Sequence, residues 1–468
     1  MPDLEGLKSR YDSLAPEVLR LARSGRRIIV VTHIDADGLC SGSIMFSALM
    51  RKGANVVLRT VPELDTKVIA ELGSQKFDYY IFTDLASTLV QELEAAFDGR
   101  FLVVDHHQLA AEDMVKPSVV NAWSYGYDGG REACSSAMAY FFATALDPAN
   151  VDLAPLAVLG ALADRQDSGS SRSLTGLNES AAEQAQSAGL LTISRDLIFS
   201  GRETRPIHEA VALTSSPYLA GLTGNKDAVL NIMHQSGIPL KDGGSWRTVS
   251  SLTTDEKMRL TELIAGAVGS SEGATGTLME LVGTVYTFVF EDSFTPLRDA
   301  REFGTLLNSC GRMRVAGAGI ALCLGDRSEA LRGAMKILSD YRGAINGAIQ
   351  ALTSDRSRFD IHGHLVFVKG EGTVEERLLG PVISILASTP EFKDKVLVGR
   401  ASSGESDLKY SARVGDLHEG DVNLGSVMRV AAEAAGGVGG GHNMAAGAKI
   451  QSSRAEAFSK SVLEQIPN

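Results

Sequence analysis

An apolar segment that ends abruptly in metal-binding residue types places the strongest constraint on the fold. Residues 28–31 read Ile-Ile-Val-Val, and His33, Asp35 and Asp37 follow at alternate positions, before Gly38. A short run of β-branched residues predicts a strand covered on both faces, and we expect Gly38 to permit a sharp exit from it. Neighbouring carboxylates repel one another unless a cation neutralises them. Taken alone, however, the segment is equally consistent with an acidic turn.

The first third of the chain alternates strand and helix signals. A helix is predicted at 3–23, where we expect Pro16 to kink or split it. Strands are predicted at 27–33, 54–61, 78–83, 101–105 and 117–121, and helices at 39–52, 65–74, 87–97, 134–146 and 152–163. This alternation indicates an α/β fold, a doubly wound and mostly parallel sheet, with helices on both faces. Ligands of such sheets bind beyond the carboxyl ends of the strands.

The pattern changes after about residue 167. Residues 168–182 are rich in Ser and Gly and are predicted as a loop, and a long helix is predicted at 328–353. A second α/β pattern then shows strands at 364–369, 395–399 and 408–414 and helices at 374–388 and 423–435. We therefore expect an N-terminal α/β domain at 1–195, a middle insertion with its return to the core at 196–327, a connector helix at 328–353 and a smaller C-terminal α/β domain at 354–468.

Composition narrows the class of protein. The chain has 468 residues and only four cysteines, with no CxxC pair, which argues against a disulfide scaffold or a Cys-rich zinc site. It shows neither a signal peptide nor an apolar run long enough to cross a bilayer, so we expect a cytoplasmic protein. The net charge of −12 does not favour a general nucleic-acid binder, although a metal cluster and a local basic patch can dominate a site.

Two further strands also end in ligand-type residues. These residues are Asp84, after the strand at 78–83, and Asp105, His106 and His107, at the end of the strand at 101–105. An Asp after a strand is often a helix N-cap, but Ser87 could take that role and leave Asp84 available. Three strand ends that all carry Asp or His are an improbable coincidence.

A fourth carboxylate follows an apolar helix. Asp164 comes directly after the helix predicted at 152–163, where the helix dipole disfavours a negative charge. A nearby cation would reverse that penalty. Asp167 is the alternative ligand in this segment, and we favour Asp164.

A glycine-rich segment lies far downstream. Residues 436–441 contain five glycines and one valine, and His442 follows. So many glycines leave backbone N–H groups open to approach, as in phosphate-binding loops, but no Lys-Ser/Thr follows to make a P-loop. Lys409 and Arg413, on the preceding strand, could add positive charge. The alternative is that this segment is a flexible linker. The presence of His442, and of a predicted strand directly after the segment, argues against a linker.

Together these motifs resemble the DHH phosphoesterase superfamily. The resemblance rests on His33-x-Asp35-x-Asp37-Gly38, Asp84, Asp105-His106-His107, Asp164 and the Gly-Gly-Gly-His442 loop of the companion DHHA1 domain. Length and motif style are most similar to archaeal RecJ-like exonucleases, relatives of bacterial RecJ and of a eukaryotic Cdc-type helicase subunit. Residues 298–312 are similar to the stretch before their connector helix. In many superfamily phosphodiesterases the first His stands four residues before the DxD pair, whereas position 31 is Val here.

The resemblance implies a site with two divalent metal ions, Mn²⁺ in preference to Mg²⁺. One ion would be held by His33, Asp35 and Asp84, and the other by Asp37, Asp84, His106 and Asp164. Asp105 would orient a neighbouring His, and His107 would contact the scissile phosphate or assist proton transfer. The DHHA1 domain would face the site across a cleft and grip substrate through Arg413, Gly439, Gly440, Gly441 and His442.

The implied activity is hydrolysis of single-stranded DNA or RNA from an end to mononucleotides, in DNA replication or repair. One alternative is a phosphodiesterase for short oligonucleotides or cyclic dinucleotides. Another is a replisome scaffold that binds the GINS complex and the replicative helicase. The degenerate relatives with such a role have lost ligands, whereas this chain keeps the whole set.

Overall fold

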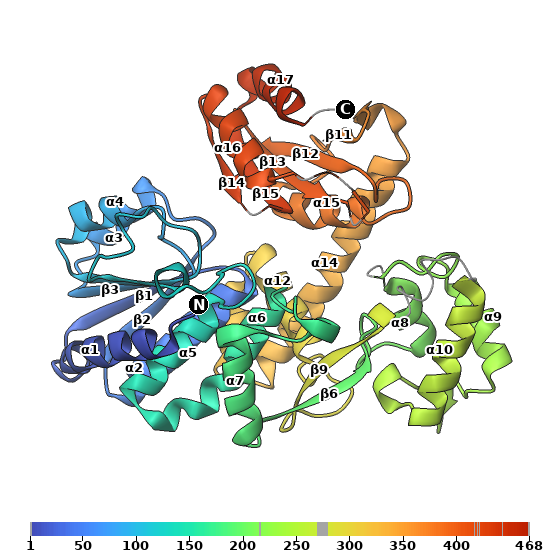
Figure 1. The fold of residues 1–468 in the computed structure, drawn as a ribbon, viewed down its shortest axis with the longest axis horizontal. Helices are drawn as coiled ribbons and strands as arrows, with labels where there is room; N and C mark the ends of the chain where they lie inside the picture. The colour runs from blue at the N-terminus through green and yellow to red at the C-terminus, as the bar shows by residue number, and fades with distance from the viewer. Residues whose placement is uncertain are drawn as a thin grey trace. The chain divides into compact units, whose positions relative to one another are not determined.

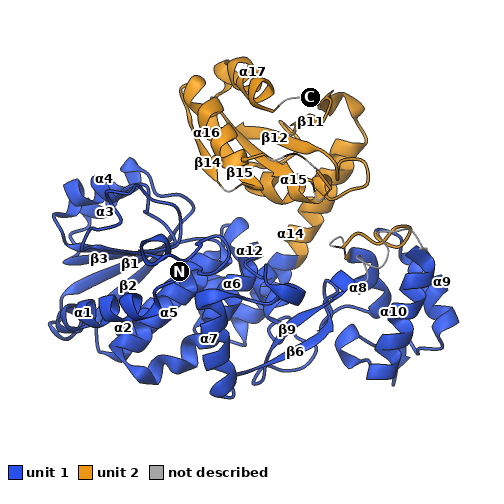
Figure 2. Ribbon diagram, in the orientation of Figure 1, with its two compact units in different colours: residues 1–213, 224–338 blue, residues 214–223, 339–468 orange. Residues whose placement is uncertain are grey.

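The computed structural model describes residues 2–214, 217–268, 279–415, 417–418, 420, 422–441 and 443–466 (Figure 1). The chain forms two compact units (Figure 2). The first comprises residues 1–213 and 224–338, and the second comprises residues 214–223 and 339–468. Among the described residues, no helix has both the length and the apolarity that a membrane crossing requires.

A five-stranded parallel sheet organises the first unit. Its strands are β1 (Arg27–His33), β2 (Asn55–Val61), β3 (Tyr79–Thr83), β4 (Phe101–Asp105) and β5 (Val119–Asn121), in the order β2-β1-β3-β4-β5. All neighbouring pairs are parallel, as predicted. In the register, Thr32 pairs with Thr83, and Thr83 pairs with Val104. The three strands that carry His33, Asp84 and Asp105 therefore end at the same level.

Helices cover both faces of this sheet (Figure 1). One face carries α1 (Leu4–Arg23), α2 (Ala36–Arg51) and α5 (Ser135–Leu146), and the other carries α3 (Thr66–Ser74) and α4 (Val90–Phe97). Ile29 and Val31 pack into a core with α3 and α4, while Ile28 and Val30 are equally buried. Burial on both faces explains why the strand is apolar throughout, without alternation.

Three details of the sequence prediction are wrong. Helix α2 begins at Ala36, not at 39, because Asp35 caps it by accepting a hydrogen bond from the Gly38 N–H at 3.0 Å. Gly38 lies in the first turn of this helix, where a Cβ would sit 2.4 Å from the His33 carbonyl oxygen. Its role is therefore close packing on the strand end, not a sharp exit. Pro16 does not split the first helix, which runs from Leu4 to Arg23.

The predicted loop at 168–182 is also partly wrong. Helix α7 (Gly176–Ser187) occupies its second half and buries Leu177 and Ala181. The polar residues that indicated a loop lie on the exposed face of this helix. The helix is stabilised by the packing of its few apolar residues, which the polar composition concealed.

The rest of the first unit contains the middle region. An antiparallel pair, β6 (Leu191–Leu197) and β9 (Val282–Phe288), flanks a largely helical insertion. The insertion contains α8 (Ile207–Leu213), α9 (Lys226–Ser236), β7 (Lys241–Asp242), β8 (Ser245–Trp246) and α10 (Thr254–Val268). Helix α6 (Ala154–Ala163) precedes it, and α12 (Ala300–Arg312) and α13 (Ala316–Cys323) follow. The predicted connector, α14 (Glu329–Thr353), begins in the first unit and continues into the second from Ser339.

The second unit is a smaller α/β domain, as predicted, and its sheet is mixed. The strand order is β10-β11-β12-β13-β15-β14. These strands are β10 (Phe359–His362), β11 (Leu365–Lys369), β12 (Val396–Ser403), β13 (Asp407–Val414), β14 (Val438–Gly441) and β15 (Ala445–Gln451), with helices α15 (Leu379–Ala387), α16 (Leu424–Ala434) and α17 (Ala455–Gln465). The glycine-rich segment forms the edge strand β14 and not only a turn. A Cβ at Gly439 would lie 2.4 Å from the Met428 carbonyl oxygen of α16, so glycine permits this close packing.

Candidate metal centre

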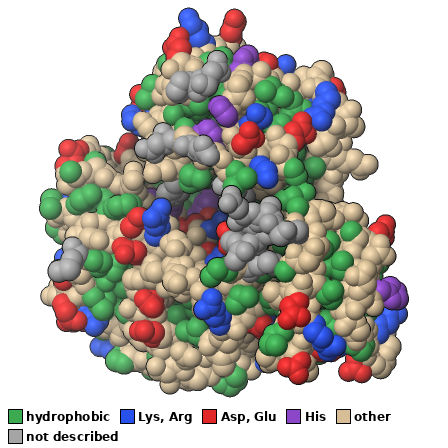
Figure 3. Space-filling model, turned by 45° about the vertical axis from the view of Figure 1, so that its right-hand side comes forward, with side chains coloured by type: hydrophobic (Ala, Val, Ile, Leu, Met, Phe, Trp, Pro, Cys, Tyr) green, Lys and Arg blue, Asp and Glu red, His purple; other side chains and the backbone are tan. Residues whose placement is uncertain are grey.

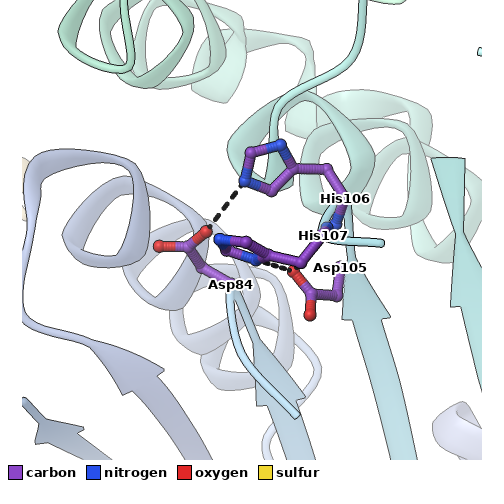
Figure 4. A group of neighbouring side chains, drawn as sticks. All are labelled: Asp84, Asp105, His106 and His107. Atoms are coloured by element: carbon purple, nitrogen blue, oxygen red, sulfur yellow. Dashed lines mark hydrogen bonds and ion pairs between the residues drawn. The ribbon is translucent and has the colours of Figure 1, made fainter. Parts of the chain in front are cut away.

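Asp84 lies at the centre of the candidate site. Its backbone is left-handed, with φ of 60°, which is uncommon for a residue other than glycine. Its side chain is buried, with Oδ1 3.3 Å from His106 Nε2 and Oδ2 3.6 Å from His33 Nδ1 (Figure 4). Oδ2 is buried and has no hydrogen-bond partner. A buried carboxylate oxygen without a partner is costly, and a bound cation would remove that cost.

His33 and Asp35 form one side of the site. His33 Nδ1 lies 2.9 Å from Asp35 Oδ2, and one ligand atom from each of His33, Asp35 and Asp84 lies within 4.8 Å of the others. Burial alone would lower the pKa of His33, but the two carboxylates raise it well above its ordinary value. Burial would raise the pKa of Asp35, and the His33 charge and hydrogen bond lower it instead. The residue at the unusual spacing is thus part of the cluster.

Asp37 is held at the N-terminus of α5. Its two carboxylate oxygens accept hydrogen bonds from the Ser135 N–H at 2.8 Å and the Ser136 N–H at 3.0 Å. Gly160 provides the space, because a Cβ there would lie 2.4 Å from Asp37 Oδ1. Burial, reinforced by the Asp84 charge, raises the pKa of Asp37 to about 8. A cation between the two carboxylates would favour the ionised form.

His106 presents one ring nitrogen to the carboxylates. Its Nδ1 lies 2.5 Å from the Gly129 carbonyl oxygen, an acceptor, so Nδ1 carries the proton. Nε2 then lies 3.3 Å from Asp84 Oδ1 and 3.9 Å from Asp37 Oδ2. A metal-binding histidine usually donates a hydrogen bond from one ring nitrogen to a backbone carbonyl or carboxylate and directs its other ring nitrogen at the metal. Burial would lower the pKa of His106, but the surrounding carboxylates raise it well above its ordinary value.

Asp164 and Asp167 occupy different environments. Asp164 caps the C-terminus of α6 and accepts a hydrogen bond from Gln166 Nε2 at 2.8 Å. Burial and the charges of Asp35 and Asp84 raise the pKa of Asp164, while His106 opposes the shift. Asp167 instead pairs with Arg301 at 2.9 Å and with Arg172 at 3.2 Å. The geometry therefore associates Asp164, and not Asp167, with the cluster.

Asp105 is fully engaged by hydrogen-bond donors. Its Oδ1 lies 2.8 Å from His107 Nδ1 and accepts from the His106 N–H at 2.8 Å, and its Oδ2 accepts from Ser87 Oγ at 2.6 Å (Figure 4). Burial would raise the pKa of Asp105, but His107 and the other donors lower it. This carboxylate is suited to orienting His107 rather than to binding a metal. Ser87 is not the predicted helix cap, since α4 begins after Leu89 without a side-chain cap.

Several residues of the site carry no sequence signal. Gln166 Nε2 also donates to the Gly129 carbonyl at 2.9 Å, and Asn178 Nδ2 donates to Gln166 Oε1 at 2.7 Å. Trp123 Nε1 donates to the His106 carbonyl at 2.9 Å. These side chains fix the positions of the candidate ligands, a role that is visible only in the folded structure.

The predicted substrate-binding residues belong to the second unit. Arg413 lies on β13 and donates to Ser384 Oγ at 2.8 Å and to Ser411 Oγ at 3.1 Å. The Lys409 Nζ atom lies 3.7 Å from Glu376 Oε1. Gly439, Gly440 and Gly441 lie on the edge strand β14, and a Cβ at Gly440 would meet open space. His442 lies outside the described residues.

Comparison with known families matches three parts of the chain. The model described as "DHH family, N-terminal domain" matches residues 27–162, "DHH-CID domain" matches 199–280 and "DHHA1 domain" matches 365–468. The chain therefore carries a DHH N-terminal domain, a DHH-CID domain and a DHHA1 domain. Asp105, His106 and His107 supply the Asp-His-His sequence, at the carboxyl end of β4.

Known proteins are similar to this chain over nearly its whole length. An uncharacterized protein of Methanocaldococcus jannaschii is 27% identical over 446 residues, which cover 94% of this chain and 93% of the relative. The structure of RecJ in complex with Mn²⁺ from Thermus thermophilus matches with a TM-score of 0.60 and 16% identity, over 98% of this chain and 55% of that one. CDC45 from Entamoeba histolytica matches with a TM-score of 0.64 and 11% identity, over 97% and 98%. The fold is therefore similar to those of RecJ and CDC45.

Proposed function

We propose that this DHH protein is a metal-dependent phosphodiesterase that hydrolyses single-stranded DNA or RNA from an end and releases mononucleotides. The observation that carries the proposal is the buried Oδ2 of Asp84, which lacks a hydrogen-bond partner and lies among metal-capable side chains. Carboxylate oxygens and imidazole nitrogens suit Mn²⁺ and Mg²⁺. The full set of candidate ligands favours catalysis over a purely structural role.

We assign the candidate ligands to two divalent ions. His33, Asp35 and Asp84 would hold one ion, and Asp37, Asp84, His106 and Asp164 would hold the other, with Asp84 shared. Two bound ions would lower the pKa of a water molecule and neutralise charge on the phosphate. The carboxylates repel one another without cations, which is why the site is expected to need both.

His107 is placed for contact with the substrate. Its side chain is 43% exposed, whereas that of His106 is buried. Burial would lower the pKa of His107, but Asp105 raises it, so the imidazole is protonated more readily than a free histidine. We propose that His107 contacts the scissile phosphate or gives a proton to the leaving oxygen, and that Asp105 fixes its ring.

Substrate binding and partners form the second part of the proposal. The DHHA1 domain would grip the nucleic acid through Arg413, the glycines of β14 and His442. Acidic and basic side chains are interspersed on the face drawn in Figure 3, so the net charge of −12 is not gathered there into one acidic patch. The GINS complex and the replicative helicase are proposed protein partners. The domain boundaries at 195, 327 and 353 stay sequence-based predictions.

Digestion of end-labelled single-stranded DNA and RNA, with Mn²⁺ and with Mg²⁺ in turn, tests the proposal. We expect stepwise release of mononucleotides by the wild type and none by Asp84→Asn. Asp98→Asn is the matched control, because Asp98 is exposed and also has a left-handed backbone, with φ of 51°. Asparagine tolerates that backbone at both positions.

The outcomes separate the alternatives. Cleavage confined to di- and trinucleotides would favour a small-substrate phosphodiesterase. A wild-type protein that cleaves nothing with either metal, yet retains the GINS complex in a pull-down, would favour a scaffold role. Unchanged cleavage by Asp84→Asn would show that the metal site is wrongly assigned.

A further inference from the structure

Helix α12 contacts both loops that carry candidate ligands. Asn308 Oδ1 accepts a hydrogen bond at 3.0 Å from the N–H of Ala36, the residue between Asp35 and Asp37. At Gly311, a Cβ would lie 1.8 Å from the Ile34 carbonyl oxygen, so the helix passes directly against this loop. At Gly304, a Cβ would lie 2.8 Å from that of Ala163, the residue before Asp164.

The first turn of α12 is itself firmly held. The Asp299 side chain caps the helix by accepting from the Arg301 N–H at 3.0 Å and the Glu302 N–H at 3.1 Å. Buried Glu302 accepts from the Glu203 N–H at 2.7 Å and from Thr204 Oγ1 at 2.5 Å. The helix that reaches the two loops is therefore anchored at its other end and can act as a rigid support.

The Ala36 N–H needs a partner from outside its own helix. It belongs to the first turn of α2, where backbone N–H groups have no acceptor within the helix. Asp35 satisfies the N–H of Gly38, and Asn308 satisfies that of Ala36. Because Ala36 joins Asp35 to Asp37, the hydrogen bond to Asn308 restrains the backbone between two candidate metal ligands.

We propose that Asn308 is a positioning residue for the metal centre, and that it acts through the Ala36 N–H. This inference rests on the proposed metal site. Asn308 does not contact the metal or the substrate in this role. It holds Asp35 and Asp37 in the relative orientation that two divalent ions require. Residues that orient metal ligands in this way typically change metal affinity or activity by about 10–100-fold when they are replaced.

The test compares three variants of the full chain by calorimetric titration with Mn²⁺. Asn308→Ala removes the acceptor, and Asn308→Asp keeps an acceptor oxygen at the same position. Thr305→Ala is the control, because Thr305 lies on the same helix and is exposed. We expect the alanine variant to bind Mn²⁺ about tenfold more weakly. We expect Asn308→Asp to restore the affinity and Thr305→Ala to leave it unchanged.

Melting temperatures in EDTA separate positioning from simple stabilisation. If Asn308→Ala lowers the melting temperature but binds Mn²⁺ as tightly as the wild type, the inference is wrong. Equal losses in the alanine and aspartate variants would also overturn it, because the acceptor would not be the relevant group. If the wild type itself binds no Mn²⁺, the proposed function fails instead, and the two failures are thus distinguishable.

Discussion

In alkaline solution, where the imidazoles of His33 and His106 are neutral, Asp84→Asn should stabilise the metal-free protein while it removes the response to metal. In the metal-free site the Asp84 carboxylate is buried beside Asp35, and its Oδ2 lacks a hydrogen-bond partner. An asparagine of the same shape carries no charge, and its amide can donate to the Asp35 carboxylate. The change therefore replaces an unsatisfied acceptor with a donor that has an acceptor nearby.

The size of the effect follows from the burial of this one atom. An unsatisfied buried polar group costs about 1–3 kcal/mol, so the variant should exceed the wild type by a similar amount in EDTA. Mn²⁺ acts in the opposite direction. A ligand at a hundredfold excess over its Kd stabilises the folded state by about 2.7 kcal/mol, and only the wild type should gain this. The order of stability should therefore reverse when Mn²⁺ is added.

Urea denaturation followed by tryptophan fluorescence suits this measurement. The chain has two tryptophans, Trp123 and Trp246, and both lie in the first unit, which contains the site. The signal therefore reports the unfolding of the first unit rather than of the second. Asp98→Asn is again the control and should stay within about 0.5 kcal/mol of the wild type in both conditions.

Two results would refute this reasoning. If Asp84→Asn is less stable than the wild type in EDTA, the Asp84 carboxylate has a favourable partner in the metal-free state. If the variant gains as much stability from Mn²⁺ as the wild type does, Asp84 is not a metal ligand.

Three further changes test other parts of the first unit. The Arg247 hydrogen bonds lower the pKa of Glu256 from 4.5 to about 2, and solvent screens part of this interaction, so Glu256→Gln should cost roughly 1–2 kcal/mol near neutral pH. That difference should shrink in urea titrations as the pH falls from 4.5 towards 2. Burial raises the pKa of Glu302 to about 7, so its ionisation destabilises the fold as the pH rises from 4.5 through 7. Glu302→Gln should then be more stable than the wild type at pH 8 by up to about 3 kcal/mol, and the advantage should vanish below pH 4.5. Gly160→Ala would place a Cβ 2.4 Å from Asp37 Oδ1, and calorimetry should show Mn²⁺ binding at least about tenfold weaker.

The parallel sheet was predictable because its strands follow a local rule. Residues 28–31, 79–83 and 101–104 are buried on both faces, so each strand is apolar throughout and stands out in the sequence. Helix α7 was missed because its exposed face is polar and resembles a loop in composition. For this segment the packing of Leu177 and Ala181 was decisive, and such packing depends on distant parts of the chain.

The candidate site was predictable only in its side-chain types. The strand ends identified His33, Asp84 and Asp105 together, and the parallel register places them at one level. The left-handed backbone of Asp84 and its unpartnered oxygen have no sequence signature. The N–H groups that hold Asp37 come from a helix almost a hundred positions later, at Ser135 and Ser136. Asn308 is 272 positions from Ala36, so no local pattern could connect them.

The candidate site combines three features that each cost free energy in the absence of a cation. Asp164 stands at the negative end of a helix, Asp84 has a left-handed backbone, and its Oδ2 is buried without a hydrogen-bond partner. Two other buried carboxylates of the first unit, those of Asp167 and Glu256, each have an arginine instead. Without a cation, these three features together would destabilise the fold. A divalent cation would remove all three at once, because it would neutralise the carboxylates, occupy the unpartnered oxygen and justify the backbone that directs it inward.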